Sequence, residues 1–282
     1  MKWKPRFIKI IILLTFLSLI APLNAQEPPK DEAKKYTLAV VPQLPPVETH
    51  ERWGPFIDKL FREYGVNFQL KAYKTFQEFE ADIINGIPDF AFMNPYQVVI
   101  AKNAHGYIPL VRDKKHIKGI IVVHKDSPIQ SVEELNNKEM ALVSPKTICS
   151  ILLNHELSTD KGKINFIAKY VGTANNVYRN VILWKTPAGG TLDMPLDREP
   201  AEIGAQLRII YKTSSIAPHS LAVHPRVPKN IYQAVINAVL KLSQDKTNHG
   251  MLDRIQMLEP VKASYQNDYM PIEKLSSDKN IK

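Results

Sequence analysis

Short apolar runs alternate with amphipathic segments along most of the chain. The run 36–41 (Tyr-Thr-Leu-Ala-Val-Val) is rich in β-formers and ends at Pro42, as is typical of a buried strand. Runs 68–73 and 89–93 have the same character. Apolar residues recur at helical spacing between the first two runs, at Trp53, Phe56, Ile57, Leu60, Phe61 and Tyr64. With helices before and after 89–93, the order β-α-β-α-β-α predicts a parallel sheet with right-handed crossovers.

A second alternating unit follows strands at 107–111 and 119–124. Its predicted elements are helix 132–135, strand 140–143, helix 148–157, strand 165–170, helix 176–183, strand 207–211, extended segment 218–223 and helix 231–242. Gly189-Gly190 is predicted to form a turn, and Tyr178 and Trp184 are predicted core residues. This pattern predicts two α/β lobes: 36–119 with 220–282, and 120–219, connected by two extended crossovers.

The N-terminus has the three parts of a secretory signal peptide. Four basic residues lie before position 10, apolar residues dominate 10–20, and a small residue, Ala25, precedes a polar stretch. The apolar run is shorter than the ~20 residues of a membrane-spanning helix. We therefore predict a signal peptide over 1–25, cleaved after Ala25, a polar tether over 26–35, and a periplasmic protein.

The amino-acid composition excludes several classes of protein. The chain has 282 residues, 44% hydrophobic, with 37 basic against 28 acidic side chains and one cysteine. That single cysteine excludes an intramolecular disulfide and a zinc ribbon. Four of the basic residues lie in the predicted signal peptide, so the excess that remains is too small for a nucleic-acid-binding surface. It is compatible with a small anionic ligand.

Candidate ligand-binding residues follow the carboxyl ends of two predicted strands. Ser144, Thr147 and Ser150 lie at a predicted helix start, where hydroxyls and free backbone N–H groups can surround a tetrahedral anion. An ordinary helix N-cap is the alternative interpretation. Asn94 and Tyr96 follow strand 89–93 and are predicted to face the presumed ligand cleft. The position of Tyr96 is equally compatible with the edge of the core.

Several segments, taken in order, resemble the substrate-binding proteins of phosphate/phosphite/phosphonate-type ABC transporters. They are 89–96 (Asp-Phe-Ala-Phe-Met-Asn-Pro-Tyr), 124–138, 176–181, 207–213, 217–219 and 224–228. The resemblance extends over about 36–275 and implies a type II periplasmic binding protein fold, with two α/β lobes joined by a two-segment hinge. It also implies an oxyanion site that includes Thr147, Ile148, Cys149 and Ser150. His219, beside the predicted hinge, is a further candidate contact.

The chain departs from the family pattern at three positions. Cys149 replaces a hydroxyl residue, Ala174 replaces a histidine that contacts the anion, and Ile117 replaces an aromatic hydroxyl. A thiol at a helix N-terminus has thiolate character. Cys149 therefore leaves two alternatives open: a sensor subunit that binds a thiophilic oxyanion such as arsenite, and a cysteine-dependent enzyme. A small buried side chain is the simpler interpretation.

The function predicted from sequence is that of a non-catalytic solute-binding protein, which captures a small anion and delivers it to an ABC importer. The expected partners are the anionic ligand and a transporter permease or, for a signalling role, a membrane sensor kinase. We expect a monomer that uses no cofactor and no metal, because His219 and His224 lack metal-ligand spacing, and that binds no nucleic acid.

Overall fold

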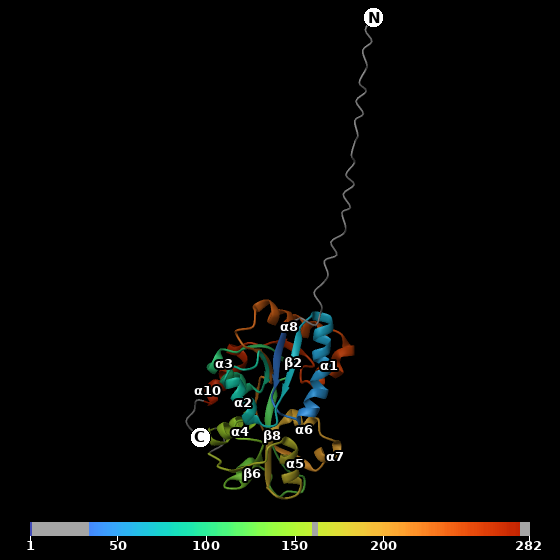
Figure 1. Cartoon of the computed structure of the whole chain (residues 1–282). Helices are drawn as coiled ribbons and strands as arrows, with labels where there is room; N and C mark the ends of the chain where they lie inside the picture. The colour runs from blue at the N-terminus through green and yellow to red at the C-terminus, as the bar shows by residue number, and fades with distance from the viewer. Residues whose placement is uncertain (2–33, 160–162, 277–282) are drawn as a thin grey trace. The chain divides into compact units, whose positions relative to one another are not determined.

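The computed structural model describes Met1 and residues 34–159 and 163–276. The predicted signal peptide after Met1 and nearly all of the predicted tether lie outside these residues. The chain divides into residues 1–32 and 33–282, and the second of these units carries all the helices and strands described below (Figure 1).

The first sheet has six strands in the order β11-β4-β10-β3-β1-β2. Their bounds are β1 Lys35–Val40, β2 Asn67–Ala72, β3 Phe90–Met93, β4 Ile108–Asp113, β10 Ser220–Val223 and β11 Pro260–Lys262. Strands β1, β2 and β3 are parallel, whereas β10 and β11 join antiparallel to their neighbours. The predicted parallel β-α-β-α-β-α arrangement is confirmed.

The second sheet has five strands in the order β7-β6-β8-β5-β9. Their bounds are β5 Ile117–His124, β6 Glu139–Leu142, β7 Ile167–Tyr170, β8 Ala188–Leu192 and β9 Leu207–Ile216. The chain passes from one sheet to the other between Asp113 and Ile117, and returns between Ile216 and Ser220. Two α/β lobes connected by two segments are the type II periplasmic binding fold, while the lobe boundaries themselves stay a prediction.

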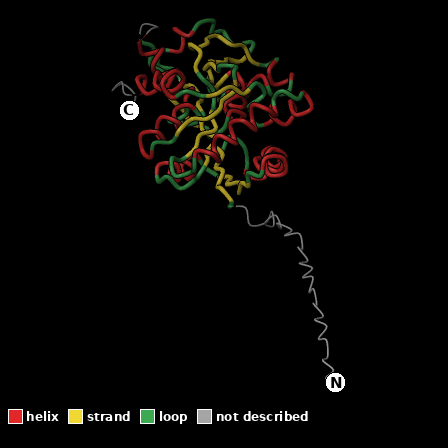
Figure 2. The backbone as a smooth tube through the Cα atoms, turned by 90° about the horizontal axis from the view of Figure 1, so that it is seen from above, coloured by secondary structure: helices red, strands yellow, loops and turns green. Residues whose placement is uncertain are grey.

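Helices lie outside the central strands (Figure 2). The α-helices are α1 Pro46–Tyr64, α2 Phe76–Ile84, α3 Pro95–His105, α4 Ile148–Thr159, α5 Ala174–Ile182, α6 Asp193–Asp197, α7 Ala201–Gly204, α8 Lys229–Leu242, α9 His249–Arg254 and α10 Met270–Ser276. Short turns at Val132–Leu135, Lys246–Asn248 and Tyr265–Tyr269 are 3-10 or π-helical, so the helix predicted at 132–135 is a single 3-10 turn.

Capping explains where two helices of the first lobe begin. The Thr75 hydroxyl accepts from the Glu78 N–H at the start of α2, as its spacing predicts. Asn94 and Gln97 form a reciprocal capping box at the start of α3, with Pro95 as the first helical residue. The Asn94 side chain is thereby fixed at the carboxyl end of β3.

The predicted turn at Gly189-Gly190 is wrong, because both residues lie inside the buried central strand β8. A Cβ on Gly189 would come within 2.5 Å of Val177 on α5, and one on Gly190 within 2.5 Å of Leu142 on the neighbouring strand β6. Glycine is required here because side chains press on the strand from both faces. From the sequence, two adjacent glycines indicate a turn, because the close packing that requires them is not visible there.

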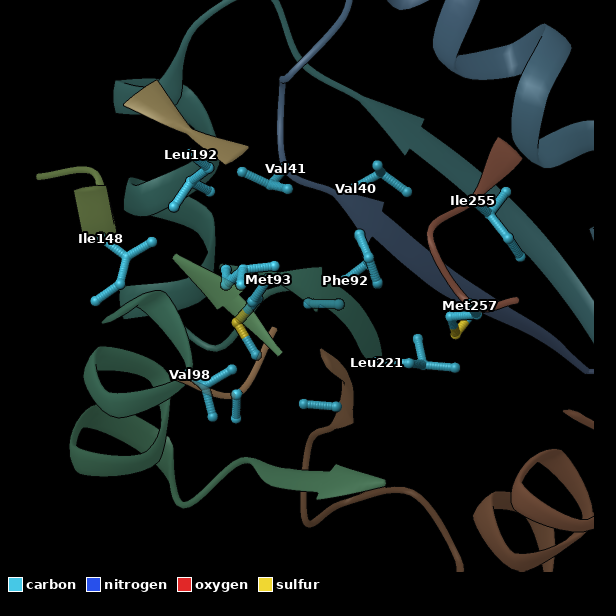
Figure 3. Packing of buried hydrophobic residues seen from close by; sticks show 14 of the residues in the cluster. Val40, Val41, Phe92, Met93, Val98, Ile148, Leu192, Leu221, Ile255 and Met257 are labelled. Atoms are coloured by element: carbon cyan, nitrogen blue, oxygen red, sulfur yellow. The ribbon is translucent and has the colours of Figure 1, made fainter. Parts of the chain in front are cut away.

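Buried residues of both lobes belong to one hydrophobic cluster, part of which Figure 3 shows. Val41 and Met93 come from the first sheet and its connections, while Ile148 and Leu192 come from the second lobe. All four are buried. The two lobes therefore share one apolar cluster.

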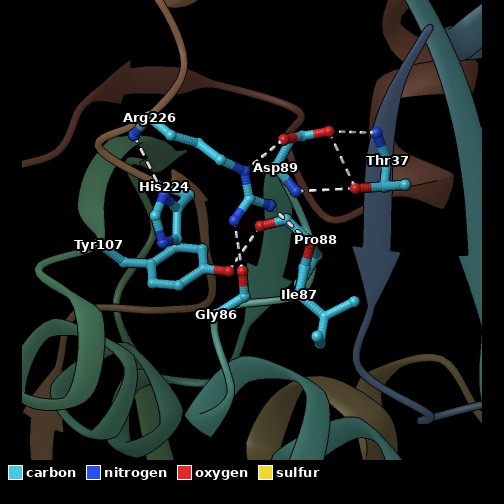
Figure 4. Close-up of polar contacts among 8 residues, drawn as sticks. All are labelled: Thr37, Gly86, Ile87, Pro88, Asp89, Tyr107, His224 and Arg226. Carbon is cyan, nitrogen blue, oxygen red and sulfur yellow. Dashed lines mark hydrogen bonds and ion pairs between the residues drawn. The ribbon is translucent and has the colours of Figure 1, made fainter.

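A polar network lies at the amino end of β3 (Figure 4). Asp89 accepts hydrogen bonds from the Thr37 N–H (2.9 Å), the Thr37 hydroxyl (3.1 Å) and Arg226 Nε (2.8 Å). The other Arg226 nitrogens donate to the carbonyls of Gly86 and Ile87. We call Thr37, Gly86, Ile87, Asp89 and Arg226 the Asp89 cluster. It fastens the start of β1 and the segment after β10 to the start of β3.

Candidate functional site

A cavity of about 530 Å³ lies between the two sheets. Its walls include residues that directly follow β1, β3, β6 and β7, and the end of β8, so it lies at the carboxyl ends of parallel strands from both sheets. Ligands of open α/β sheets bind at such strand ends. Two residues outside the parallel strands, His219 before β10 and Gln256 after α9, complete the first-lobe wall.

At least four helices of the described part of the chain begin at this cavity. Its lining includes the N-cap residues Pro45 of α1, Asn94 of α3 and Thr173 of α5, and the first two residues of α4, Ile148 and Cys149. The first N–H groups of a helix have no intrahelical acceptor, and the helix dipole is positive at this end. Four such ends converging on one cavity favour an anion.

The turn before α4 is held by its own hydroxyl groups. The Thr147 hydroxyl donates to the Ser144 carbonyl (3.0 Å) and lies 3.0 Å from Ser150 Oγ, which itself donates to the Ser144 carbonyl (2.7 Å). Of the residues predicted here, Thr147, Ile148 and Cys149 line the cavity, whereas Ser144 and Ser150 are not among its lining residues. The two serines shape the turn that presents Thr147.

Cys149 lines the cavity but does not have the electrostatics expected of a reactive cysteine. Its side chain is 3% exposed. Burial raises the pKa of the Cys149 thiol well above its ordinary value, and an interaction with the Ile120 backbone opposes this only in part. This shift disfavours the thiolate alternative and agrees with the simpler interpretation of Cys149 as a small buried side chain.

His219 belongs to the cavity wall and is held by two glutamines. Its ring stacks on Phe92, with centroids 5.6 Å apart, and its Nε2 accepts from the Gln43 amide at 3.0 Å. Gln43 in turn accepts from the Gln256 amide at 2.7 Å. Burial, and to a lesser extent Arg198, lowers the pKa of His219 to about 3, so the imidazole is neutral at physiological pH. Its Nδ1 is buried without a hydrogen-bond partner among the described residues.

The two candidates after β3 differ in position. Asn94 is buried and lines the cavity, where its side-chain oxygen caps α3. Tyr96 is only partly buried and is not among the lining residues. The neighbouring Lys146 has its pKa raised chiefly by its hydrogen bond to Glu80.

Sequence reasoning missed four charged residues in the cavity wall: Glu48, Arg52, Arg198 and Glu199. Arg198 donates to the Asp253 carboxylate at 3.0 Å. Burial raises the pKa of Glu199. Arg52 makes no hydrogen bond or ion pair with the residues that the structure describes. The helical pattern of α1 indicates its apolar face, but nothing in the sequence shows which polar residue of the opposite face reaches the cleft.

Two ion pairs connect the lobes, and a third joins the segment between β4 and β5 to the second lobe. Lys146 Nζ lies 2.9 Å from the Glu80 carboxylate, Arg198 Nη2 lies 3.0 Å from Asp253, and Lys115 Nζ lies 3.4 Å from Asp197. Only the first pair includes a buried group, since the Glu80 side chain is 8% exposed. The first two pairs join residues of different lobes, so they depend on how the lobes are arranged.

Neither metal clusters nor membrane-spanning helices occur in the described ranges. No group of three or more His, Cys, Asp or Glu side chains there is arranged to hold a metal ion. No helix within those residues combines the length and apolar character needed to cross a membrane.

Comparisons with known proteins agree with this geometry. The family model described as "ABC transporter, phosphonate, periplasmic substrate-binding protein" matches residues 38–269. No curated protein matches the chain. The family and its structural relatives are substrate-binding transport proteins, not enzymes.

Solved structures share the fold at low sequence identity. PhnD1 from Prochlorococcus marinus, in complex with methylphosphonate, is 14% identical with a TM-score of 0.78, and the match covers 89% of this chain and all of that one. A binding protein component of an ABC phosphonate transporter from Pseudomonas aeruginosa is 13% identical with a TM-score of 0.74, covering 87% and 86%. A Xanthomonas citri protein bound to chloride ion is 16% identical with a TM-score of 0.71, covering 88% and 97%. Since the family match extends over most of the sequence, the chain belongs to the periplasmic substrate-binding proteins of ABC phosphonate transporters.

Proposed function

We propose that this protein binds a phosphorus oxyanion of the phosphate, phosphite or phosphonate type between its lobes and delivers it to an ABC importer. The observation that carries the proposal is the convergence of four helix N-termini on one cavity. Thr147 adds a hydroxyl, and neutral His219 lies in the opposite wall. A membrane-bound permease is the expected partner of the closed form, and we expect a monomer exported by a cleaved signal peptide.

Closure of the lobes is the proposed mechanism. The ligand contacts both lobes, so it has more favourable interactions with the closed state than with the open state and shifts the population toward closure. The interlobe pair of Lys146 with Glu80 and the apolar cluster shared by the lobes support a closed arrangement. The permease would then distinguish loaded from empty protein by this shape.

A thiolate-based arsenite sensor is not favoured. Cys149 lines the cavity, but burial raises the pKa of its thiol, which opposes thiolate formation. Soft-ligand binding would have to overcome the same desolvation. If the protein signals to a sensor kinase, its signal is a phosphorus ligand, because no observation favours binding through the thiol.

Thermal stabilisation of the purified protein tests the proposal. Phosphate, phosphite, methylphosphonate, sulfate and arsenite are compared at equal concentrations. A ligand at 100 times its dissociation constant stabilises the native state by about 2.7 kcal/mol, a shift of several degrees for a domain of this size. We expect the shift with a phosphorus oxyanion and its reduction in Thr147→Ala, whereas the exposed Thr247→Ala control keeps it. No shift with any phosphorus compound would contradict the proposal.

A further inference from the structure

The cavity is larger than a tetrahedral ion needs. Its volume of about 530 Å³ lies within the range of pockets that hold small organic molecules. Part of its wall is apolar, from Val41, Leu44 and Phe76 in the first lobe and Val143, Leu192 and Met194 in the second. Such a wall gains free energy by covering carbon atoms and gains none from an inorganic ion. The ligand is therefore expected to carry an organic substituent beside its anionic group.

Most polar groups of the first-lobe wall are already occupied. Gln43 donates to His219 and accepts from Gln256, and Asn94 caps α3. Arg198, which belongs to the second lobe, is paired with Asp253. These side chains keep the wall in shape, and the buried His219 Nδ1, which has no partner among the described residues, is an uncharged group that a ligand can still contact.

Arg52 brings a positive charge to the first-lobe wall of the cavity. It lies on the second turn of α1, is partly buried and lines the cavity. Its guanidinium forms no hydrogen bond or ion pair within the described part of the chain, and Glu48, one turn earlier on the same helix, forms no ion pair with it. A partly desolvated guanidinium with free donors is suited to bidentate binding of a carboxylate or a second oxyanion.

We infer that the ligand is an organic phosphorus oxyanion that bears a second acidic group, which Arg52 binds. The phosphorus group lies at the N-termini of α4 and α5 beside Thr147, the carbon chain lies against the apolar wall, and the second acid reaches α1. This inference rests on the proposed function and narrows its ligand to diacidic organic compounds such as phosphonocarboxylates.

Calorimetric titration of two matched ligands tests the inference. 3-Phosphonopropionate and propylphosphonate have the same number of carbons and differ in a carboxylate against a methyl group. We expect the carboxylate compound to bind about 10- to 100-fold more tightly, as expected of a charge-assisted hydrogen bond. Arg52→Gln should remove this difference, because both ligands then lose the same general attraction to a positive charge and only the carboxylate compound loses hydrogen bonds to the guanidinium. Arg62→Gln, at the exposed far end of the same helix, makes the same change of net charge and should retain the difference.

The outcomes separate the two proposals. Equal affinities in the native protein, or a preference that survives in Arg52→Gln, would overturn the inference while propylphosphonate binding still supports the proposed function. Failure of every phosphorus ligand to bind would overturn both.

Discussion

Polar groups at the two ends of strand β3 differ in whether they have hydrogen-bond partners. At its amino end, Asp89 accepts three hydrogen bonds and Arg226 uses all its terminal nitrogens. At its carboxyl end, Asn94 opens onto a cavity where the His219 Nδ1 and the Arg52 guanidinium have no partner among the described residues. A completed network holds the fold together, whereas an incomplete one at the carboxyl ends of strands is where a ligand can supply the missing partners.

The same contrast appears in the pKa values at the two ends. Burial alone would raise the pKa of Asp89, but hydrogen bonds from Thr37 and Arg226 outweigh it and lower the pKa, so this carboxylate stays charged. His219 has no charged partner to offset its burial, so burial lowers its pKa to about 3 and the ring stays neutral. The Asp89 cluster therefore stabilises a charged carboxylate, whereas burial in the cavity wall keeps His219 uncharged.

The largest expected effect is on the Asp89 cluster. Asp89→Ala removes three hydrogen bonds and leaves the Thr37 N–H and Arg226 without their acceptor, which should lower the free energy of unfolding by about 2–3 kcal/mol. Urea denaturation measures this loss. Asp58→Ala, an exposed aspartate on α1, is the control. Equal loss in both variants, or a fall in ligand affinity in Asp89→Ala, would break the comparison between the two ends.

The pH dependence of stability tests the neutral His219. Its folded pKa of about 3 lies below the unfolded value near 6.5. The unfolded state therefore binds the extra proton between these values, and the stability that His219 contributes above pH 6.5 is lost as pH falls, by up to about 1.4 kcal/mol per pH unit. Denaturation of the native protein and of His219→Gln at pH 7 and pH 5 measures the difference. Identical slopes in both proteins would mean that His219 is not buried as a neutral ring.

The interlobe pair of Lys146 with Glu80 should affect ligand affinity modestly. Lys146→Met leaves the buried Glu80 carboxylate unpaired in the closed state, which should weaken ligand binding about 3- to 10-fold. Lys115→Met removes a pair in which both side chains are more than half exposed and should leave the affinity unchanged. Calorimetric titration checks both variants, and equal effects would show that the buried carboxylate does not favour closure.

The smallest effect is expected at Cys149. Because burial raises the pKa of its thiol, alkylation at pH 8 should be far slower in the native protein than in the unfolded chain, and Cys149→Ser should change phosphonate affinity less than Thr147→Ala does. Mass spectrometry follows the alkylation. Rapid modification of the native protein would restore the thiolate interpretation.

The alternation of strands and helices was predictable because each element has its own apolar period. The capping pair of Thr75 with Glu78 was also readable, since it depends on local spacing. Gly189-Gly190 was not, because only the tertiary packing of Val177 and Leu142 explains glycine in a buried strand. Trp184, predicted as core, is 57% exposed. Its backbone is left-handed after the end of α5, and its ring packs on His124.

The candidate site was predictable only in part. The strand-to-helix turns located Asn94 and Thr147, because helix starts after strands have a local signature. Arg52 and Gln256 were missed, since a solvated face and a cleft face of a helix or loop have the same polar composition. Desolvation of Cys149 also depends on neighbours that are distant in sequence.

The most direct test of the central claim is calorimetric titration of methylphosphonate into a variant with a filled cavity. Ala174 lines the cavity at the first residue of α5, so Ala174→Trp should occupy the space at this helix N-terminus. The exposed Ala104→Trp on α3 is the control. We predict one site per chain in the native protein and in Ala104→Trp, and no detectable binding in Ala174→Trp. Unchanged binding in Ala174→Trp would show that the ligand site lies elsewhere.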